Sequence, residues 1–259
     1  MDYYDLLLAG KISGGGGGSG EWTTDGIASG TEPNGAIVLG NSVTSIVNYA
    51  FDNHPITSIV GPEVTSIGAE SLNNTQITEI TDTSFPKLGK SELCVLVLRL
   101  PLTCTKIKLT GSYIALSSGS YALRDCKGLV TAEFPYAAKD VGNIYKGLGA
   151  YCFNGCSNLE LADCGEVTNI SNSAFQNATK LTTIVLRSTS VVSLAGSGAF
   201  NNTPFKSGGT GGTIYIPESL YDHLGDNSSS DYKHATNWLT VDGYGTITWA
   251  KIEGSIYEL

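Results

Sequence analysis

An internal repeat constrains this chain more than any other feature of its sequence. Three segments, 122–134, 152–164 and 174–186, align without gaps. Two earlier segments, 50–59 and 71–80, follow the same pattern with one residue fewer. Where the pattern is regular, its copies begin about 21 to 25 residues apart. Self-similarity at such a period is typical of a chain that folds as an array of stacked units.

Each copy holds a small and a large apolar residue, a polar turn, and a short stretch in which apolar and polar residues alternate. Alternation with period two indicates a strand with one buried and one solvated face. One unit cannot bury its apolar face alone, but stacked units can bury it against each other. The sequence therefore predicts a mainly β solenoid with a ladder of parallel strands. We expect glycine and asparagine at its corners, where the backbone needs positive φ.

The repeated phrase itself resembles a known family. In its clearest copies, Val-Thr-Ser-Ile at 43–46 and 64–67 precedes the apolar pair and the polar turn. Over 43–81 and 114–216 the chain resembles the leucine-rich repeats of BspA-like surface proteins. This resemblance implies a leucine-rich-repeat solenoid with short turns over 21–216. The pattern breaks at 82–113, where Leu93–Leu100 and Cys104–Leu109 look strand-like but begin only 11 residues apart. We interpret that stretch as one irregular repeat plus an extra hairpin.

Composition and charge exclude several classes of function. The chain carries 15 Lys and Arg against 24 Asp and Glu, a net charge of −9. A nucleic-acid binder or an electrostatic membrane binder needs clustered basic residues, so we expect neither partner. No run of about 18 apolar residues occurs, so no membrane insertion is expected. The first residues also lack the basic start and long apolar run of a cleaved signal peptide.

The six cysteines allow three interpretations, namely disulfides, a zinc site or buried reduced thiols. A disulfide framework is unnecessary for a chain of this length. Cys152 and Cys156 have a spacing compatible with zinc, but no second ligand pair matches them. In the family, Cys126 and Cys156 occupy an inward turn position, and Cys164 lies at the inward end of a strand. We therefore expect buried, reduced thiols. Because no catalytic motif is present, we also expect no cofactor, no metal and no enzyme activity.

The two ends of the chain have separate predicted roles. Residues 14–20 form a glycine-rich linker, which separates the segment 1–13 from the repeats. That segment is either a tail without a role or an attachment peptide for a virion or other scaffold protein. Its candidate attachment residues are Tyr3, Tyr4, Leu6, Leu7 and Leu8. Residues 217–259 are predicted to form a C-terminal cap, because an open solenoid end exposes core and strand edges.

Both ends resemble phage tail-associated leucine-rich-repeat proteins of gut bacteria and their phages. For the C-terminal end the resemblance rests on Ala199–Phe205, Gly211–Tyr221 and Ala235–Trp238, and it implies a short helix over the last strand. We expect Trp238, Trp249 and Tyr244 to form an apolar plug in the cap. An aromatic binding site is the competing interpretation of these three residues.

The predicted strands also define a candidate binding face. Solenoids commonly use an extended sheet face for recognition, although a merely solvated face has the same pattern. The outward strand positions are Ser58, Val60, Glu79, Thr81, Val95, Val97, Lys106, Lys108, Thr131, Glu133, Leu161, Asp163, Thr183 and Val185.

The leading hypothesis is a non-enzymatic adhesion or host-recognition protein on a phage tail or other virion surface. Its partner would be a protein or glycan on the host surface. A bacterial cell-surface adhesin and a self-assembling scaffold are the alternatives, and homo-oligomer formation stays open.

Overall fold

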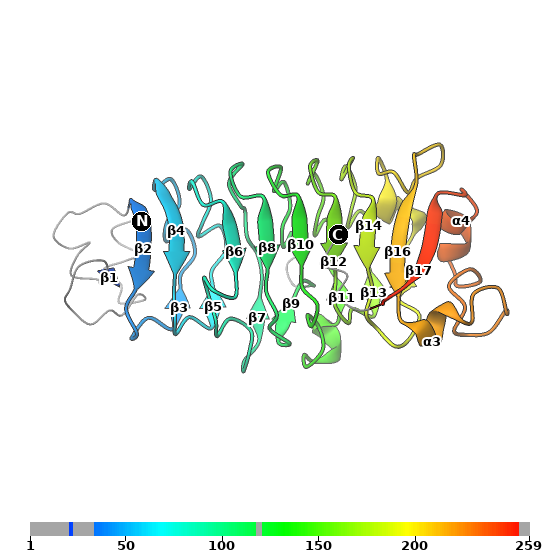
Figure 1. The fold of residues 1–259 in the computed structure, drawn as a ribbon, viewed down its shortest axis with the longest axis horizontal. Helices are drawn as coiled ribbons and strands as arrows, with labels where there is room; N and C mark the ends of the chain where they lie inside the picture. Colours follow the sequence, from blue (N-terminus) through cyan, green and yellow to red (C-terminus); the bar gives the residue numbers. More distant parts are fainter. Residues whose placement is uncertain (1–20, 23–33, 118–120, 254–259) are drawn as a thin grey trace.

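Each repeat forms one turn of an elongated coil, and strands from successive turns lie side by side (Figure 1). The computed structural model describes residues 21–22, 34–117 and 121–253. All strand pairs within these residues are parallel. The predicted β solenoid with a parallel ladder is thereby confirmed. The expected attachment segment 1–13 and linker 14–20 lie outside the described residues.

One side of the coil, called the broad side below, carries two sheets whose strands come from consecutive turns. Strands β1 (Glu21–Trp22), β2 (Gly35–Leu39) and β4 (Ile56–Val60) form the first sheet. The second sheet has seven strands in sequence order. These are β6 (Glu79–Thr81), β8 (Lys106–Lys108), β10 (Thr131–Glu133), β12 (Leu161–Asp163), β14 (Thr183–Val185), β16 (Gly212–Ile216) and β17 (Ile247–Lys251).

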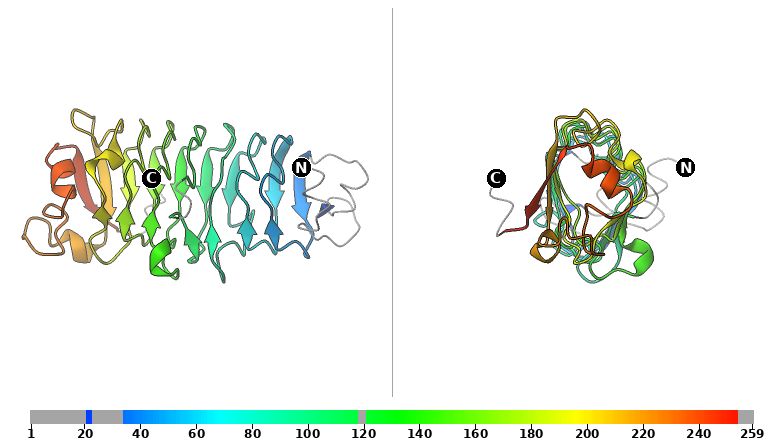
Figure 2. Two further views of the ribbon diagram at one scale, coloured as in Figure 1. Left: turned by 180° about the vertical axis from the view of Figure 1, so that it is seen from behind. Right: turned by 90° about the vertical axis from the view of Figure 1, so that its right-hand side faces the viewer.

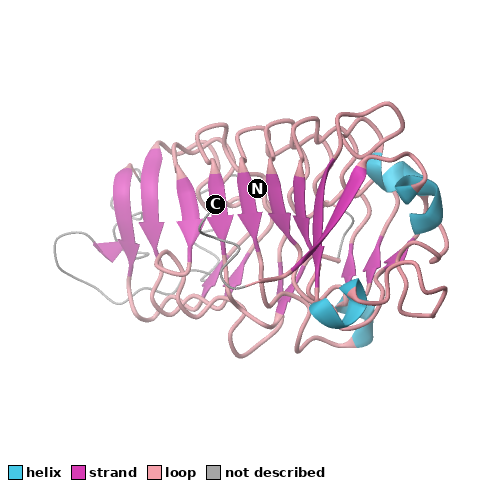
Figure 3. Cartoon of the chain, turned by 45° about the vertical axis from the view of Figure 1, so that its right-hand side comes forward, coloured by secondary structure: helices cyan, strands magenta, loops and turns pink. Residues whose placement is uncertain are grey.

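The opposite side of the coil, called the narrow side below, consists of strands of two residues each. These strands lie behind the broad sheet in Figure 3. They form the pairs β3–β5 and β7–β9 and the group β11–β13–β15. Their bounds are Ser45–Ile46 for β3, Ser66–Ile67 for β5, Cys94–Val95 for β7, Ile114–Ala115 for β9, Gly147–Leu148 for β11, Asn169–Ile170 for β13 and Ser193–Leu194 for β15. Among the described residues, two short 3-10 helices lie between strands, η3 (Asn143–Tyr145) and η4 (Ser197–Phe200).

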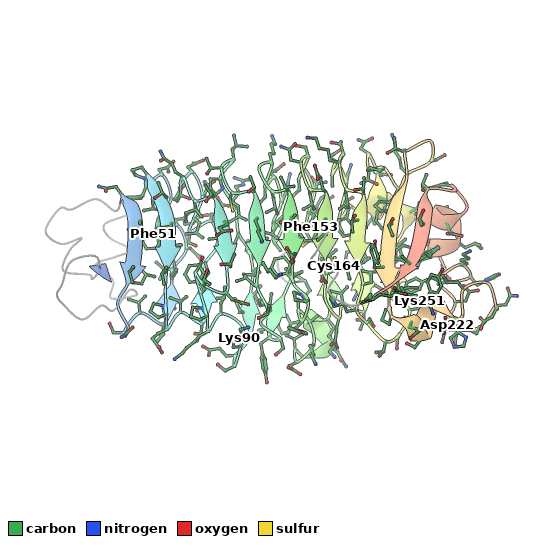
Figure 4. All side chains as sticks on the ribbon, viewed as in Figure 1. Phe51, Lys90, Phe153, Cys164, Asp222 and Lys251 are labelled. Atoms are coloured by element: carbon green, nitrogen blue, oxygen red, sulfur yellow. The ribbon has the colours of Figure 1, made fainter. Side chains whose placement is uncertain are left out.

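Inward side chains stack in columns along the coil, as the repeat predicts. One column comes from the middle residues of the seven-stranded sheet, and its first six members have no exposed surface: Ile80, Ile107, Ala132, Ala162, Ile184 and Ile214. A second column holds the large residue of each apolar pair, from Phe51 to Phe153 (both labelled in Figure 4) and on to Phe200. The Phe175 ring stacks on Phe153 at 5.5 Å and on Phe200 at 5.6 Å between ring centroids. Each turn therefore buries its apolar pair only through its neighbours.

The polar turns repeat their backbone conformation from one unit to the next. Asn53, Asn74, Asn177 and Asn202 all have φ between 54° and 66° at equivalent positions. The Asn74 amide donates to Asn53 over 2.9 Å, and the Asn202 amide donates to Asn177 over 2.8 Å. At the same position Gly155 has φ +76°, and an added Cβ would collide with the Asp125 carboxylate. The expected use of asparagine and glycine at corners with positive φ is confirmed.

The extra hairpin predicted within 82–113 is wrong. Ile80 pairs in register with Ile107, so β6 and β8 are direct neighbours and this turn of the coil takes 27 residues. The segment Leu93–Leu100 contributes β7 on the narrow side, where Cys94 pairs with Ile114 in parallel. Its alternate residues Cys94, Leu96, Leu98 and Leu100 are all buried. The stretch is one repeat, called the enlarged repeat below because it exceeds the regular spacing of about 21 to 25 residues. Its extended segment replaces a polar turn, so no antiparallel pair is needed.

Two helices and a strand follow β16 at the C-terminal end. Helix α3 (Glu218–Tyr221) and helix α4 (Trp238–Asp242) precede β17, and α4 lies across the end of the coil (Figure 2). Strand β17 then returns to the broad sheet and pairs with β16, so the ladder extends beyond the expected boundary at 216. The ammonium of Lys251 on β17 lies 2.8 Å from Glu218 and 3.1 Å from Asp222, beside which it is labelled in Figure 4.

An aromatic cluster closes the coil, but its membership differs from the prediction. Trp238 and Tyr232 are fully buried, and the Trp249 ring centroid lies 5.7 Å from that of Trp238. Tyr244 is 36% exposed and does not belong to the plug. Tyr232 takes its place, because its hydroxyl reaches the backbone of the last narrow turn. Since Trp238 has no exposed surface, it contributes no aromatic binding surface.

Side chains at this end also form hydrogen bonds with the free backbone edge of the last narrow turn. The Tyr232 hydroxyl accepts from the Val192 N–H over 3.0 Å, and the Trp238 indole N–H donates to the Val192 carbonyl over 2.6 Å. The Asn237 amide donates to the Leu194 carbonyl over 2.6 Å. An unpaired strand edge recruits other chains, so these three side chains protect the end of the narrow ladder. In the described part of the chain, no helix has the length and apolar character to cross a bilayer.

Phe175→Ala should lower the free energy of unfolding by about 3–5 kcal/mol, because it leaves a cavity in the phenylalanine stack. Urea unfolding measures this loss. Leu102→Ala is the matched control, since Leu102 is 74% exposed and its truncation should change stability by less than about 0.5 kcal/mol. Equal losses for both variants would contradict the predicted stack.

Tyr232→Phe should cost about 1–3 kcal/mol, because it keeps the buried ring but leaves the Val192 N–H without an acceptor. Thermal and urea unfolding measure the loss, with Tyr244→Phe as control. An unchanged stability in Tyr232→Phe would show that this hydroxyl does not protect the strand edge.

Candidate functional site

The outer face of the seven-stranded sheet is the candidate site. Its strands pair in register, so their outward residues form two rows. The first row consists of Glu79, Lys106, Thr131, Leu161, Thr183, Thr213 and Thr248. The second row consists of Thr81, Lys108, Glu133, Asp163, Val185, Tyr215 and Ala250. Together these two rows are called the outer sheet face below.

The first row is accessible along its whole length. Glu79 and Thr248 are exposed, and the members between them are partly exposed. Ser58 and Val60 of β4 are also exposed and lie on the neighbouring broad sheet. The structure therefore leaves nine of the predicted outward residues accessible: Ser58, Val60, Glu79, Thr81, Lys106, Lys108, Thr131, Leu161 and Thr183.

The second row corrects the prediction at three positions. Glu133 is 6% exposed, and Asp163 and Val185 have no exposed surface. The Lys108 ammonium lies 3.0 Å from the Glu133 carboxylate. Val185 lies in register between Asp163 and Tyr215 on the adjoining strands. These three side chains pack among their neighbours and present no free surface to a ligand.

Arg187 is a residue that the sequence interpretation missed. Its Nε and Nη2 lie 2.9 Å and 2.6 Å from Oδ2 of Asp163. The Gly165 N–H donates to the same carboxylate over 3.1 Å. Such a two-pronged guanidinium contact is strong and directional, which is how a charged Asp163 can be buried. An aspartate at a strand end followed by an arginine one turn later was the available sequence signal.

Val95 and Val97 do not belong to this face. Val95 lies on β7, and β7 pairs with β9 on the narrow side of the coil. Val97 lies just beyond β7 and lines a pocket at the turn edge. Their placement follows from the enlarged repeat, because its extended segment passes along the opposite side of the coil from β8. The mistaken hairpin therefore also misplaced two candidate binding residues.

The cysteines are buried and unpaired, as predicted. Burial raises the pKa of the Cys94 thiol to about 11 and that of Cys104 to about 12. Burial also raises the pKa values of Cys152, Cys156 and Cys164 well above the ordinary range. A protonated thiol is a poor nucleophile and a poor metal ligand. Among the described residues, no group of three or more His, Cys, Asp or Glu side chains is placed to hold a metal ion.

The histidines have local partners. The His234 ring lies 2.7 Å from the Asp231 carboxylate, and the His223 ring lies 2.6 Å from that of Asp226. Burial raises the pKa of Asp231, but hydrogen bonds from Gly225, His234, Lys233 and Asn227 outweigh this effect, and the net pKa is lowered. These contacts organise the cap loop.

The comparison with protein families agrees with the repeat architecture. The family model described as "BspA type Leucine rich repeat region" matches residues 31–93 and 103–223, in six copies. The interval between the two matched ranges falls within the enlarged repeat. One similar solved structure is a leucine-rich repeat protein from Bacteroides ovatus ATCC 8483, at 13% identity and a TM-score of 0.26. The similarity covers 83% of this chain and 84% of that one. No curated protein matches the sequence.

Arg187→Met should lower the free energy of unfolding by about 3–5 kcal/mol, because it leaves the Asp163 carboxylate buried without its guanidinium. Urea unfolding of the full chain tests this expectation. Lys87→Met is the matched control: it removes a pair with Glu63 in which the two side chains are 53% and 35% exposed. Such a surface pair is worth only about 0–1 kcal/mol. If both variants lose the same stability, the buried pair has no special role.

Proposed function

Because the chain belongs to the BspA-type leucine-rich repeat family, we propose that it is a non-enzymatic adhesion or host-recognition protein. Repeats of this family generally serve in binding other proteins. The observation that carries the proposal is the accessible first row on the outer sheet face. Seven parallel strands hold this row in register, so a binding partner meets a surface whose backbone is already ordered. Preorganisation of this kind lowers the entropic cost of binding.

The chemistry of the row fits a protein or glycan on a cell surface. Leu161 lies in register between Thr131 and Thr183, so an apolar side chain is flanked by two hydroxyls. Hydroxyls both donate and accept hydrogen bonds, and Leu161 supplies apolar contact. Glu79 and Lys106 add opposite charges at neighbouring positions. The row thus offers mixed contacts rather than the basic surface that a nucleic acid requires.

The side chains that could support catalysis favour a binding role over an enzymatic one. The buried thiols with raised pKa values stay protonated at neutral pH. His223 and His234 are paired with carboxylates on the cap loop rather than with a nucleophile. An enzyme would need titratable groups that converge on one pocket.

We further propose a phage tail or other virion surface as its location, on the ground of the resemblance that the sequences of the two ends suggest. The segment 1–13 would attach it to a virion protein, and several copies on one particle would gain avidity through their effective concentration. The bacterial cell surface is the competing location, and the family relationship favours it. Immunogold labelling of purified virions separates the two: a protein absent from particles but present on cell envelopes overturns the virion placement and leaves the binding role intact.

Thr131→Arg combined with Thr183→Arg should abolish binding through the outer sheet face, because two long charged side chains would cover Leu161. The full chain is first screened against printed bacterial glycans and surface proteins, and the variant is then titrated with each hit. Ser193→Arg is the matched control, since Ser193 is exposed on the narrow side. Binding that survives the double substitution, or is lost equally in the control, would contradict the proposed face.

A further inference from the structure

A pocket of about 190 Å³ lies at the turn edge of the coil, away from the outer sheet face. Its lining residues are Glu70, Val97, Leu98, Arg99, Tyr121 and Arg124. Backbone hydrogen bonds place the pocket over the enlarged repeat. The Glu70 N–H donates to the Val97 carbonyl over 3.1 Å, and the Leu98 N–H donates to the Ala122 carbonyl over 2.6 Å. The turns of Glu70 and Tyr121 therefore flank the enlarged repeat on either side.

The enlarged repeat creates this pocket by omitting an outward side chain. In the other turns, the residue two positions before the buried large residue is at least partly exposed, as with Tyr49, Glu70, Tyr121 and Tyr151. Leu96 holds the equivalent position before Leu98 and has no exposed surface. The row of outward side chains is interrupted there, and Glu70 and Tyr121 face the gap from its two ends.

One wall of the pocket is aromatic and carries a guanidinium. The Tyr121 ring stacks on Tyr151 at 5.7 Å between centroids, and the Arg124 guanidinium lies 5.0 Å from the Tyr121 centroid. The buried Arg124 Nε lies 3.3 Å from Asp125 Oδ2, while the Arg124 side chain as a whole is 43% exposed. The remaining N–H groups of this guanidinium can therefore donate to a ligand oxygen.

The opposite wall supplies an acceptor and a second donor. Arg99 Nη1 and Glu70 Oε2 are 3.8 Å apart, which is too long for a direct hydrogen bond. Their side chains are 48% and 33% exposed, so both can turn toward a ligand. The lining carries two guanidiniums and one carboxylate, and Asp125, which lies beside Arg124 outside the lining, balances the second guanidinium. Together with Asp125, the site is therefore polar without a net charge.

We propose that this pocket binds one pyranose ring of a neutral glycan. Sugar hydroxyls donate and accept hydrogen bonds, so they match Glu70 as acceptor and Arg99 and Arg124 as donors. The polarised C–H groups of a sugar ring pack on the negative face of an aromatic ring, which Tyr121 provides. The volume is below the roughly 300–1,000 Å³ of pockets for drug-sized ligands, which fits a single ring. This site does not depend on the outer sheet face or on the proposed adhesion role.

Saturation-transfer NMR of the full chain tests the proposal directly. The probes are the methyl glycosides of glucose, galactose, mannose and N-acetylglucosamine, with methyl glucuronide as the charged comparison. At least one neutral glycoside should bind, and Tyr121→Ala should weaken it about tenfold or more, a loss of about 1.4 kcal/mol. Tyr121→Phe should retain binding because it keeps the ring. Arg124→Met should weaken binding because it removes the guanidinium donors.

Tyr136→Ala is the matched control, since Tyr136 is 48% exposed and does not line the pocket. Thermal unfolding of each variant separates a lost contact from a lost fold, and Arg124→Met keeps the test valid if Tyr121→Ala unfolds. The proposal is overturned if no neutral glycoside binds, or if binding survives both Tyr121→Ala and Arg124→Met. Tighter binding of methyl glucuronide than of every neutral probe would also overturn it, because the site would then select an acidic ligand.

Discussion

Hydrogen bonding between successive turns is the constraint on which the rest of this protein depends. Within each of the two broad sheets, neighbouring strands come from successive turns and pair in parallel, so their N–H and C=O groups are satisfied by another repeat. The same register stacks Ile107 on Ala132 and Phe175 on Phe200. A turn therefore has neither paired edges nor a core of its own. This interdependence explains why one repeat pattern recurs and why the C-terminal end needs a cap.

The functional features arise where the repeat is regular and where it departs from regularity. Regular strands produce the outer sheet face, because in-register pairing aligns every outward residue. The enlarged repeat produces the turn-edge pocket, because Leu96 points inward where other turns place an outward side chain. At the C-terminal end, Tyr232 and Trp238 replace the missing next turn at the Val192 backbone.

Much of the fold could be predicted from sequence, because period-two alternation and the Asn and Gly corners are local signals. Asn74 and Gly155, for example, identify corners by their own conformational preferences. The path of 82–113 could not be predicted in this way. The sequence pattern of an extended apolar segment such as Leu93–Leu100 is the same whether the segment pairs with the preceding or the following turn. Only the register of Cys94 with Ile114 distinguishes the two arrangements.

The candidate site shows a second limit of sequence analysis. Alternation assigns Asp163 and Thr183 to the same outer face, but burial depends on neighbours that are remote in sequence. Arg187 covers Asp163 from the following turn, whereas the structure leaves Thr183 partly exposed. The Trp238 and Trp249 plug follows from their aromatic character. That Tyr232 rather than Tyr244 belongs to the plug could be recognised only from the position of the Val192 backbone.

The central claim is an unbroken ladder in register from β6 to β17, through both the enlarged repeat and the cap. Spin labels at Glu79→Cys and Thr248→Cys, the two ends of the first row, measure it directly. Because the native thiols are buried, only the introduced cysteines should react. Six steps of about 4.8 Å predict a separation of about 29 Å between the labelled backbone positions by double electron–electron resonance. A single narrow distribution near that value supports the ladder. A distribution centred beyond about 40 Å, or one spread over several distances, would contradict it.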